Sequence, residues 1–207
     1  MKRNLIVFQM LVLSIFAQEI EHRKLKGEYA KIDTSRDKKV IAKLTSKDLK
    51  IRKEAISEIL SAPNVYTPLS LYTLSRVLFN EDRKVEAVRW FYTGQLRARY
   101  DANRCADETA RQLVDGLNQL IGPEINKYAF ADKKLLWAEV MNAIEFVSKN
   151  PEEYDHRWIN LHGMAAFASS ESSSLPLSLP KSQWPKIKEK TIAEYKAGFE
   201  EAYQQIP

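Results

Sequence analysis

The sequence predicts an all-α fold, a compact multi-helix domain built around one antiparallel helical hairpin. The chain has 207 residues, of which 44% are hydrophobic and 29% charged, as in an ordinary globular protein. It contains only six Gly and eight Pro, too few for the many turns of a β-sandwich. Apolar residues instead recur at helical spacing over most of the chain beyond residue 45. The single Cys excludes an intramolecular disulfide and a multi-cysteine zinc site.

Residues 1–17 predict a secretory signal peptide. Lys2 and Arg3 precede an apolar run from Leu5 to Phe16, and the small residue Ala17 follows it. The run is too short to span a membrane comfortably, since a spanning helix needs about 20 apolar residues. We therefore expect cleavage after Ala17, a periplasmic or secreted location, and no stable membrane span afterwards. An uncleaved N-terminal anchor is the alternative.

Residues 18–44 predict a basic, loosely ordered arm. Between Arg23 and Lys53 there are twelve basic and four acidic residues. Few large apolar residues occur before Val40, which favours a segment held loosely on the body. Such an arm could bind an anionic surface, such as lipid head groups or a cell-wall polymer, or it could be only a solvated tether. The scarcity of aromatic residues argues against nucleic acid as a partner.

A helical domain is expected over residues 45–168. Thr45 and Asp48 have the spacing of a capping box, and the apolar residues that follow them have helical spacing. Pro63 is expected to end this helix.

The segment Pro68–Arg99 predicts the antiparallel hairpin, because two helices with apolar faces are separated by the polar turn Asn80–Asp82. The small residues Ser75 and Ala87 are expected to let these helices approach closely. The spacing resembles one tetratricopeptide-type unit, whose positions are occupied in order by Leu71, Leu74, Ser75, Leu78, Ala87, Phe91 and Gly94. The resemblance implies a binding role without chemistry. Arg99 stands where that family has Pro, and no second unit follows, so other helices must cover the hairpin.

Further helices are expected to supply that cover. One runs from Ala106 to Ile121 and ends at Gly122–Pro123, a second runs from Asp132, its N-cap, to Asn150, and a short one lies within residues 158–167. Residues 169–183 are rich in Ser and Pro and predict a surface loop or linker. Residues 184–207 predict a C-terminal helix that docks on the body through its aromatic side chains.

We find no residue pattern that predicts a catalytic centre, a metal site or a cofactor. His156 and His162 are six residues apart, which places them on different faces of a helix, so they predict structural side chains. A turn between them could still assemble a hydrolytic site with Asp155 or Glu152, and this is the enzymatic alternative. Cys105 is expected to be buried as a small hydrophobe.

The candidate partner-binding residues lie in the second hairpin helix and just after it. Trp90, Phe91 and Tyr92 are consecutive and point in different directions, so at least one must face another helix or a partner. Three arginines repeat every seven residues, which on one continuous helix would form a carboxylate-binding stripe, namely Arg97, Arg104 and Arg111. Trp90, Tyr92 and these arginines are the predicted partner contacts. A solvated face paired with nearby acids is the alternative.

Together these features predict an exported, non-enzymatic protein-interaction module. The combination of a signal peptide with a small helical body is similar to periplasmic immunity proteins, and this resemblance implies neutralisation of a secreted toxin by steric occlusion. Two alternatives stay open. One is a periplasmic hydrolase or cell-wall enzyme that uses the His156–His162 region, and the other is an envelope assembly factor tethered by its basic arm.

Overall fold

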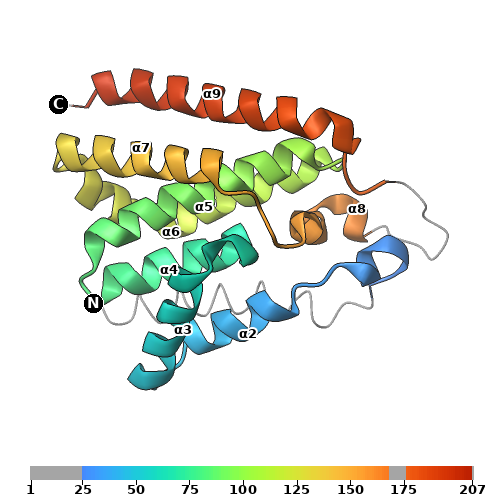
Figure 1. The fold of residues 1–207 in the computed structure, drawn as a ribbon, viewed down its shortest axis with the longest axis horizontal. Helices are drawn as coiled ribbons and strands as arrows, with labels where there is room; N and C mark the ends of the chain where they lie inside the picture. Colours follow the sequence, from blue (N-terminus) through green and yellow to red (C-terminus); the bar gives the residue numbers. More distant parts are fainter. Residues whose placement is uncertain (1–24, 168–175, 207) are drawn as a thin grey trace.

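The computed structural model describes residues 25–167 and 176–206, and over these ranges the predicted all-α fold is confirmed. No strand occurs in them; Cys105 and Ser178 form one isolated bridge. The helices stack in layers, with α9 on one side and α2 and α3 on the other (Figure 1). The predicted signal peptide and the first part of the Ser/Pro-rich loop, residues 169–175, lie outside the described residues.

The predicted helical hairpin is confirmed and forms the centre of the fold. α4 (Pro68–Asn80) is joined by a short turn to α5 (Lys84–Arg104) and packs along it (Figure 1). Asp82 in this turn has a positive φ of 64°, a conformation that Asp tolerates better than most residues. α5 continues past Arg99, the predicted end of the hairpin, because Ala102 still packs in the core.

Small side chains set the distance between α4 and α5, as predicted. Ser75 and Ala87 are completely buried. A third small residue, Gly94, faces α4, and a Cβ atom added to it would lie 3.4 Å from the Leu71 Cβ. A larger side chain at these positions would therefore push the two helices apart.

The segment expected to be a loose arm is instead packed on the hairpin. Its described part contains the 3₁₀ turn η1 (Gly27–Lys31) and the helix α2 (Ser35–Leu44). Val40 and Leu44 are buried in one cluster with residues of α3 (Leu49–Ser61) and α4. The prediction was wrong because it gave weight to the high charge and overlooked these two residues, which are one helical turn apart.

The predicted capping box at Thr45 and Asp48 is also wrong. Thr45 follows the end of α2, and its hydroxyl donates to the Ile41 carbonyl at 2.9 Å. Asp48 alone caps α3 and accepts from the Lys50 N–H at 2.8 Å. Because α2 occupies the chain as far as Leu44, the next helix has to begin after a turn.

The helix predicted to end at Gly122–Pro123 runs on through Pro123. It starts with the 3₁₀ turn η3 (Glu108–Arg111) and continues as α6 (Gln112–Phe130). A proline inside a helix removes one backbone hydrogen bond. The cost is offset because apolar side chains on both sides of it are buried in the core, namely Ile121, Ile125 and Ala129.

Two further predictions are confirmed. The Asp132 carboxylate caps α7 (Lys133–Lys149) by accepting from the Leu135 N–H at 3.0 Å. The C-terminal helix α9 (Trp184–Gln204) docks along α5 and α7 (Figure 1). The remaining short elements are η2 (Pro63–Val65), η4 (His156–His162), α8 (Met164–Phe167) and η5 (Lys181–Gln183).

A short main-chain pairing fixes the approach to α9. The Ala106 N–H donates to the Leu177 carbonyl at 3.1 Å, and the Leu179 N–H donates to the Arg104 carbonyl at 2.9 Å. Trp184 closes the pairing, since its indole N–H donates to the Leu179 carbonyl at 2.8 Å. The start of α9 is thereby tied to the end of α5.

Among the helices within residues 25–167 and 176–206, none combines the length and the apolar character needed to cross a bilayer.

Candidate functional site

Four of the five predicted partner-binding side chains are buried. These are Trp90, Tyr92, Arg97 and Arg104. α5, which carries all four, is surrounded by α4, α6, α7 and α9, so it has no open side for an arginine stripe. The prediction of a partner surface is therefore wrong for Trp90, Arg97 and Arg104, whereas Tyr92 lines a groove described below. Consecutive aromatic residues can all be buried when a helix is covered on several sides.

Arg111 is the fifth predicted residue, and it does lie near the surface. It belongs to η3, beyond the end of α5, because the chain turns at Cys105 with an extended backbone. The seven-residue repeat therefore does not align it with Arg97 and Arg104. Its guanidinium lies 3.4 Å from the Glu108 carboxylate.

Arg104 belongs to a buried network centred on Asp101. Arg104 Nη2 donates to Asp101 Oδ1 at 2.6 Å, and the Tyr154 hydroxyl and the Trp158 indole N–H donate to Asp101 Oδ2 at 2.9 and 2.7 Å. Burial raises the pKa of the Asp101 carboxyl, and the positive charge of Arg104 opposes that rise. The network joins the end of α5 to η4. It also gives the indole N–H of the buried Trp158 a hydrogen-bond partner.

Arg97 is completely buried and forms no ion pair with the described residues. Its guanidinium donates to the Pro63 carbonyl at 3.1 Å and to Asn64 Oδ1 at 2.7 Å. The same group lies 5.0 Å from the centre of the Phe146 ring, within the range of a cation–π contact. Arg97 therefore anchors the η2 turn to α5 and α7.

The structure brings His156 to Ser178 rather than to His162. His156 Nε2 lies 2.8 Å from Ser178 Oγ, and the imidazole packs edge-on against Trp184 with ring centres 4.5 Å apart. His162 ends η4 before Gly163, and its ring packs against Trp158. Within the described ranges, no group of three His, Cys, Asp or Glu side chains could hold a metal ion.

The environment of His156 disfavours its use as a general base. Burial, together with the positive charges of Arg104, Arg157 and Lys181, lowers its pKa to about 4. Asp155, which precedes it, is engaged by Arg157 Nη2 at 2.7 Å. Proton abstraction near neutral pH needs a base with a pKa close to the working pH. The contact with Ser178 instead holds the segment before α9 against η4.

Cys105 is buried, as predicted. Burial raises the pKa of its thiol to about 11, so the reactive thiolate is scarce at neutral pH.

A groove between α6, α7 and α9, with α5 as its floor, is the candidate functional site. Its volume is about 740 Å³, within the range of small-ligand and peptide-anchor sites. Aromatic side chains from α5, α6 and α9 line it, namely Tyr92, Phe130, Tyr195, Phe199 and Tyr203. We refer to this feature as the α9 groove.

Polar groups converge on the floor of the α9 groove. The Tyr92 hydroxyl donates to Asn126 Oδ1 at 3.0 Å, and the Tyr195 hydroxyl donates to Gln95 Oε1 at 2.6 Å. Burial raises the pKa of both phenols, so both stay neutral hydrogen-bond donors. Arg99 is exposed, lies 5.4 Å from the centre of the Tyr195 ring and forms no ion pair with the described residues.

A smaller hollow of about 300 Å³ continues the α9 groove beyond Arg99. Arg99 and Tyr195 line both parts, and Arg111 lines the smaller one. Asp115 also lines this hollow, and Glu194 lines both parts, so the hollow contains two acids as well as the two arginines. Two predicted partner residues therefore lie at the candidate site, Tyr92 on the floor of the α9 groove and Arg111 at the adjoining hollow.

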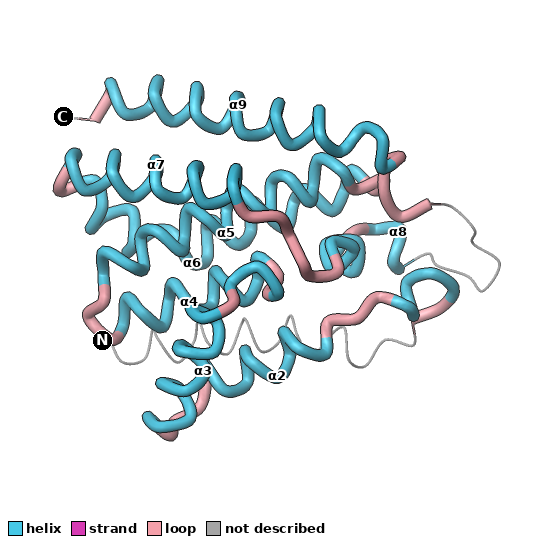
Figure 2. The backbone as a smooth tube through the Cα atoms, in the orientation of Figure 1, coloured by secondary structure: helices cyan, strands magenta, loops and turns pink. Residues whose placement is uncertain are grey.

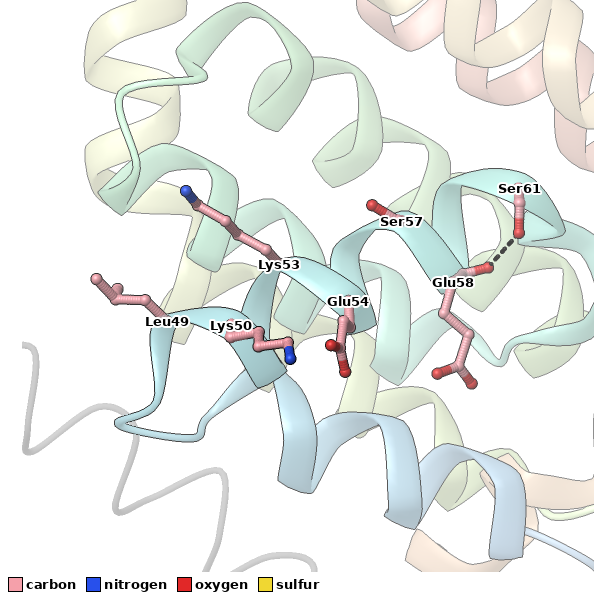
Figure 3. Close-up of a pocket in the computed structure, with 7 residues that line it drawn as sticks. All are labelled: Leu49, Lys50, Lys53, Glu54, Ser57, Glu58 and Ser61. Atoms are coloured by element: carbon pink, nitrogen blue, oxygen red, sulfur yellow. Dashed lines mark hydrogen bonds between the residues drawn. The ribbon is translucent and has the colours of Figure 1, made fainter.

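Another hollow, of about 880 Å³, lies along α3. All of its lining residues belong to this one helix, from Leu49 to Ser61 (Figure 3). The described residues provide no second wall, so this feature is an exposed helix face rather than an enclosing site.

Comparison with known proteins provides one distant relative. No protein-family model matches the chain, and no solved structure matches it. An uncharacterised protein of Haemophilus influenzae is 30% identical over 120 residues, which cover 56% of this chain and 46% of that protein. The chain therefore spans less than half the length of this relative. The resemblances to a tetratricopeptide unit and to immunity proteins stay predictions.

Proposed function

We propose that this protein is a non-catalytic module that binds another protein through the α9 groove. The observation that carries the proposal is an aromatic groove with an exposed arginine, Arg99, that forms no ion pair with a described carboxylate, although Glu194 also lines the groove. Aromatic side chains and arginines supply much of the affinity at protein interfaces. Their grouping in one concave site favours binding over an exclusively structural role for α9.

The segment of the partner that fits this groove combines an apolar side chain with a carboxylate. The apolar group enters the part lined by Leu136, Phe199 and Tyr203. The carboxylate pairs with Arg99, with Arg111 close to the adjoining hollow. Asp115 and Glu194 would repel a partner whose surface is acidic throughout. The site therefore favours a partner with one carboxylate placed to reach Arg99.

No catalytic role is proposed for His156 or His162, because each imidazole packs against a Trp ring and the environment of His156 lowers its pKa. Export is proposed on the N-terminal sequence alone. The resemblance to immunity proteins predicts that binding neutralises a toxin by steric occlusion. Co-purification of a toxin as the main partner would support this prediction.

The test is co-purification of the tagged protein from cells that produce it, followed by binding measurements with the partner identified. Arg99→Glu should weaken binding about 30-fold or more, since it replaces an attractive charge by a repulsive one. Phe199→Ala should weaken it about tenfold. Lys196→Glu, which changes an exposed charge on α9 outside the groove lining, is the matched control and should bind like wild type.

The double variant His156→Ala with His162→Ala separates binding from catalysis. It should retain the partner if it folds, as judged by its circular dichroism spectrum. Unchanged affinity in both Arg99→Glu and Phe199→Ala would refute the α9 groove as the binding site. N-terminal sequencing of the isolated protein tests export, since Met1 retained on a cytosolic product would contradict it.

A further inference from the structure

The corner between α2 and α3 is basic and carries exposed apolar side chains. Residues 35–54 contain eight basic and three acidic residues. Leu49 and Ile51, in the first turn of α3, are 59% and 39% exposed. Single exposed apolar residues are common on protein surfaces and need no explanation. Exposed Leu and Ile side chains at a corner rich in lysine suggest a binding surface.

The lysines at this corner are available to a partner. Lys47, Lys50 and Lys53 are exposed and form no ion pair with the described residues. Lys43 differs, because its ammonium lies 2.8 Å from the Glu58 carboxylate. Three positive charges are therefore not neutralised by a neighbouring side chain.

At the start of α3, Leu49 and Lys53 extend to the same side, whereas Lys50 extends toward Glu54 (Figure 3). Leu49, Lys50 and Lys53 extend from the first two turns of α3 (Figure 3). The acids Glu54 and Glu58 lie farther along the same helix (Figure 3). A flat anionic surface that meets the Leu49 and Lys53 side of this corner would thus contact these two side chains before it reached Glu58.

We propose that this corner docks on the surface of an anionic lipid bilayer. Lys47, Lys50 and Lys53 contact the lipid head groups, while Leu49, the more exposed of the two apolar side chains, enters the boundary between the head groups and the acyl chains. The lysines alone would attract any polyanion. The exposed Leu49 side chain favours a bilayer, because a soluble polyanion offers it no apolar surroundings.

This inference does not rest on the proposed function. α2 and α3 lie on one side of the molecule and α9 lies on the other (Figure 2). A protein docked by its α2–α3 corner would therefore leave the α9 groove open.

The test is sedimentation of the purified full chain with vesicles of phosphatidylcholine, with and without phosphatidylglycerol. Binding should require phosphatidylglycerol and weaken as salt is added. Replacing Lys47, Lys50 and Lys53 together by Gln should weaken it roughly 100-fold, at about fivefold for each lysine near the surface. Leu49→Ser should weaken it about tenfold, because an apolar side chain no longer leaves water.

Matched control variants on other surfaces distinguish an effect of this corner from an effect of net charge or of exposed apolar area in general. Lys127, Lys134 and Lys186 on α6, α7 and α9 are exposed and form no ion pair with the described residues, and their replacement by Gln removes the same charge. Met164 is 64% exposed on α8, and Met164→Ser matches Leu49→Ser. Both controls should bind like wild type. All variants are first checked by thermal melting, and the single variants Lys50→Gln and Leu49→Ser replace the triple variant if it does not fold.

Three results would overturn the proposal. Equal loss of binding in the two triple-lysine variants would show that only net charge matters. A second such result is that Leu49→Ser binds vesicles like wild type and that the wild-type protein binds heparin as tightly as it binds anionic vesicles. This would indicate a site for soluble polyanions. Equal sedimentation with both kinds of vesicle would exclude recognition of anionic lipid.

Discussion

The two sides of the α4–α5 hairpin are covered in different ways. On one side, α2 and α3 pack a small cluster that centres on Leu71 and Leu74. On the other side, α6, α7, η4 and α9 build a larger cluster around Phe91. Each side also contains one buried aspartate, Asp37 on α2 and Asp101 on α5. The partners of these two carboxylates differ.

Asp37 is held by neutral donors. Its Oδ1 accepts from the Thr67 N–H, the Thr67 hydroxyl and the Ser70 hydroxyl at 2.8, 2.8 and 2.6 Å. These groups lie at the N-terminus of α4, where the helix dipole favours a negative charge. Asp101 is held by a buried cation, Arg104, together with two ring donors. The small side of the hairpin therefore depends on a helix terminus, and the large side depends on a buried ion pair.

The largest effect is expected from Asp101→Ala. The substitution leaves the buried Arg104 guanidinium without its carboxylate, so the free energy of unfolding should fall by about 3–5 kcal/mol. Urea denaturation measures this change. The double variant Asp101→Asn with Arg104→Met removes both charges and should lose less stability than Asp101→Ala. A double variant that is less stable than the single one would show that the ion pair is not the main interaction.

A smaller effect is expected from Asp37→Ala. It leaves neutral donors without an acceptor and exposes no uncompensated charge, so the cost should be about 2 kcal/mol. Hydrogen exchange should show faster opening of α2 and little change in α6. If Asp37→Ala destabilises the protein as much as Asp101→Ala does, the contrast between the two sides fails.

The smallest effect concerns pH and involves His156, which lies on the side that carries Asp101. The pKa of His156 is about 4 in the folded protein, below its ordinary value of 6.5 in the unfolded chain. As the pH falls from about 6.5 to 4, the unfolded chain binds a proton that the folded protein does not, so the free energy of unfolding decreases. The loss should be about 1–2 kcal/mol after allowance for screening. Urea midpoints across this range should fall less steeply in His156→Gln.

The elements that could be predicted are those specified by residues close in sequence. The hairpin follows from apolar spacing on either side of a polar turn, and the start of α7 follows from the Asp132 cap. The errors arose where distant contacts outweigh local signals. Pro123 is tolerated inside α6 because its neighbours are buried, and α2 is ordered because Asp37 binds the start of α4.

The candidate site was harder to predict, because its residues come from four helices. Tyr195 meets Gln95 and Arg99 only in the folded chain. One signal was available: Tyr195, Phe199 and Tyr203 repeat every four residues along α9. We interpreted these aromatic residues as a docking face, although all three also line the groove. The buried positions of Arg97 and Arg104 could not be read from a charge pattern, since charged residues are usually exposed.

The pairing of residues 104–106 with 177–179 has a consequence for folding kinetics. Contacts between residues close in sequence form early, whereas those that close a long loop form late. The α4–α5 hairpin belongs to the first kind, and the attachment of α9 belongs to the second. During refolding, most of the helical signal should therefore recover before the molecule regains its α9 groove.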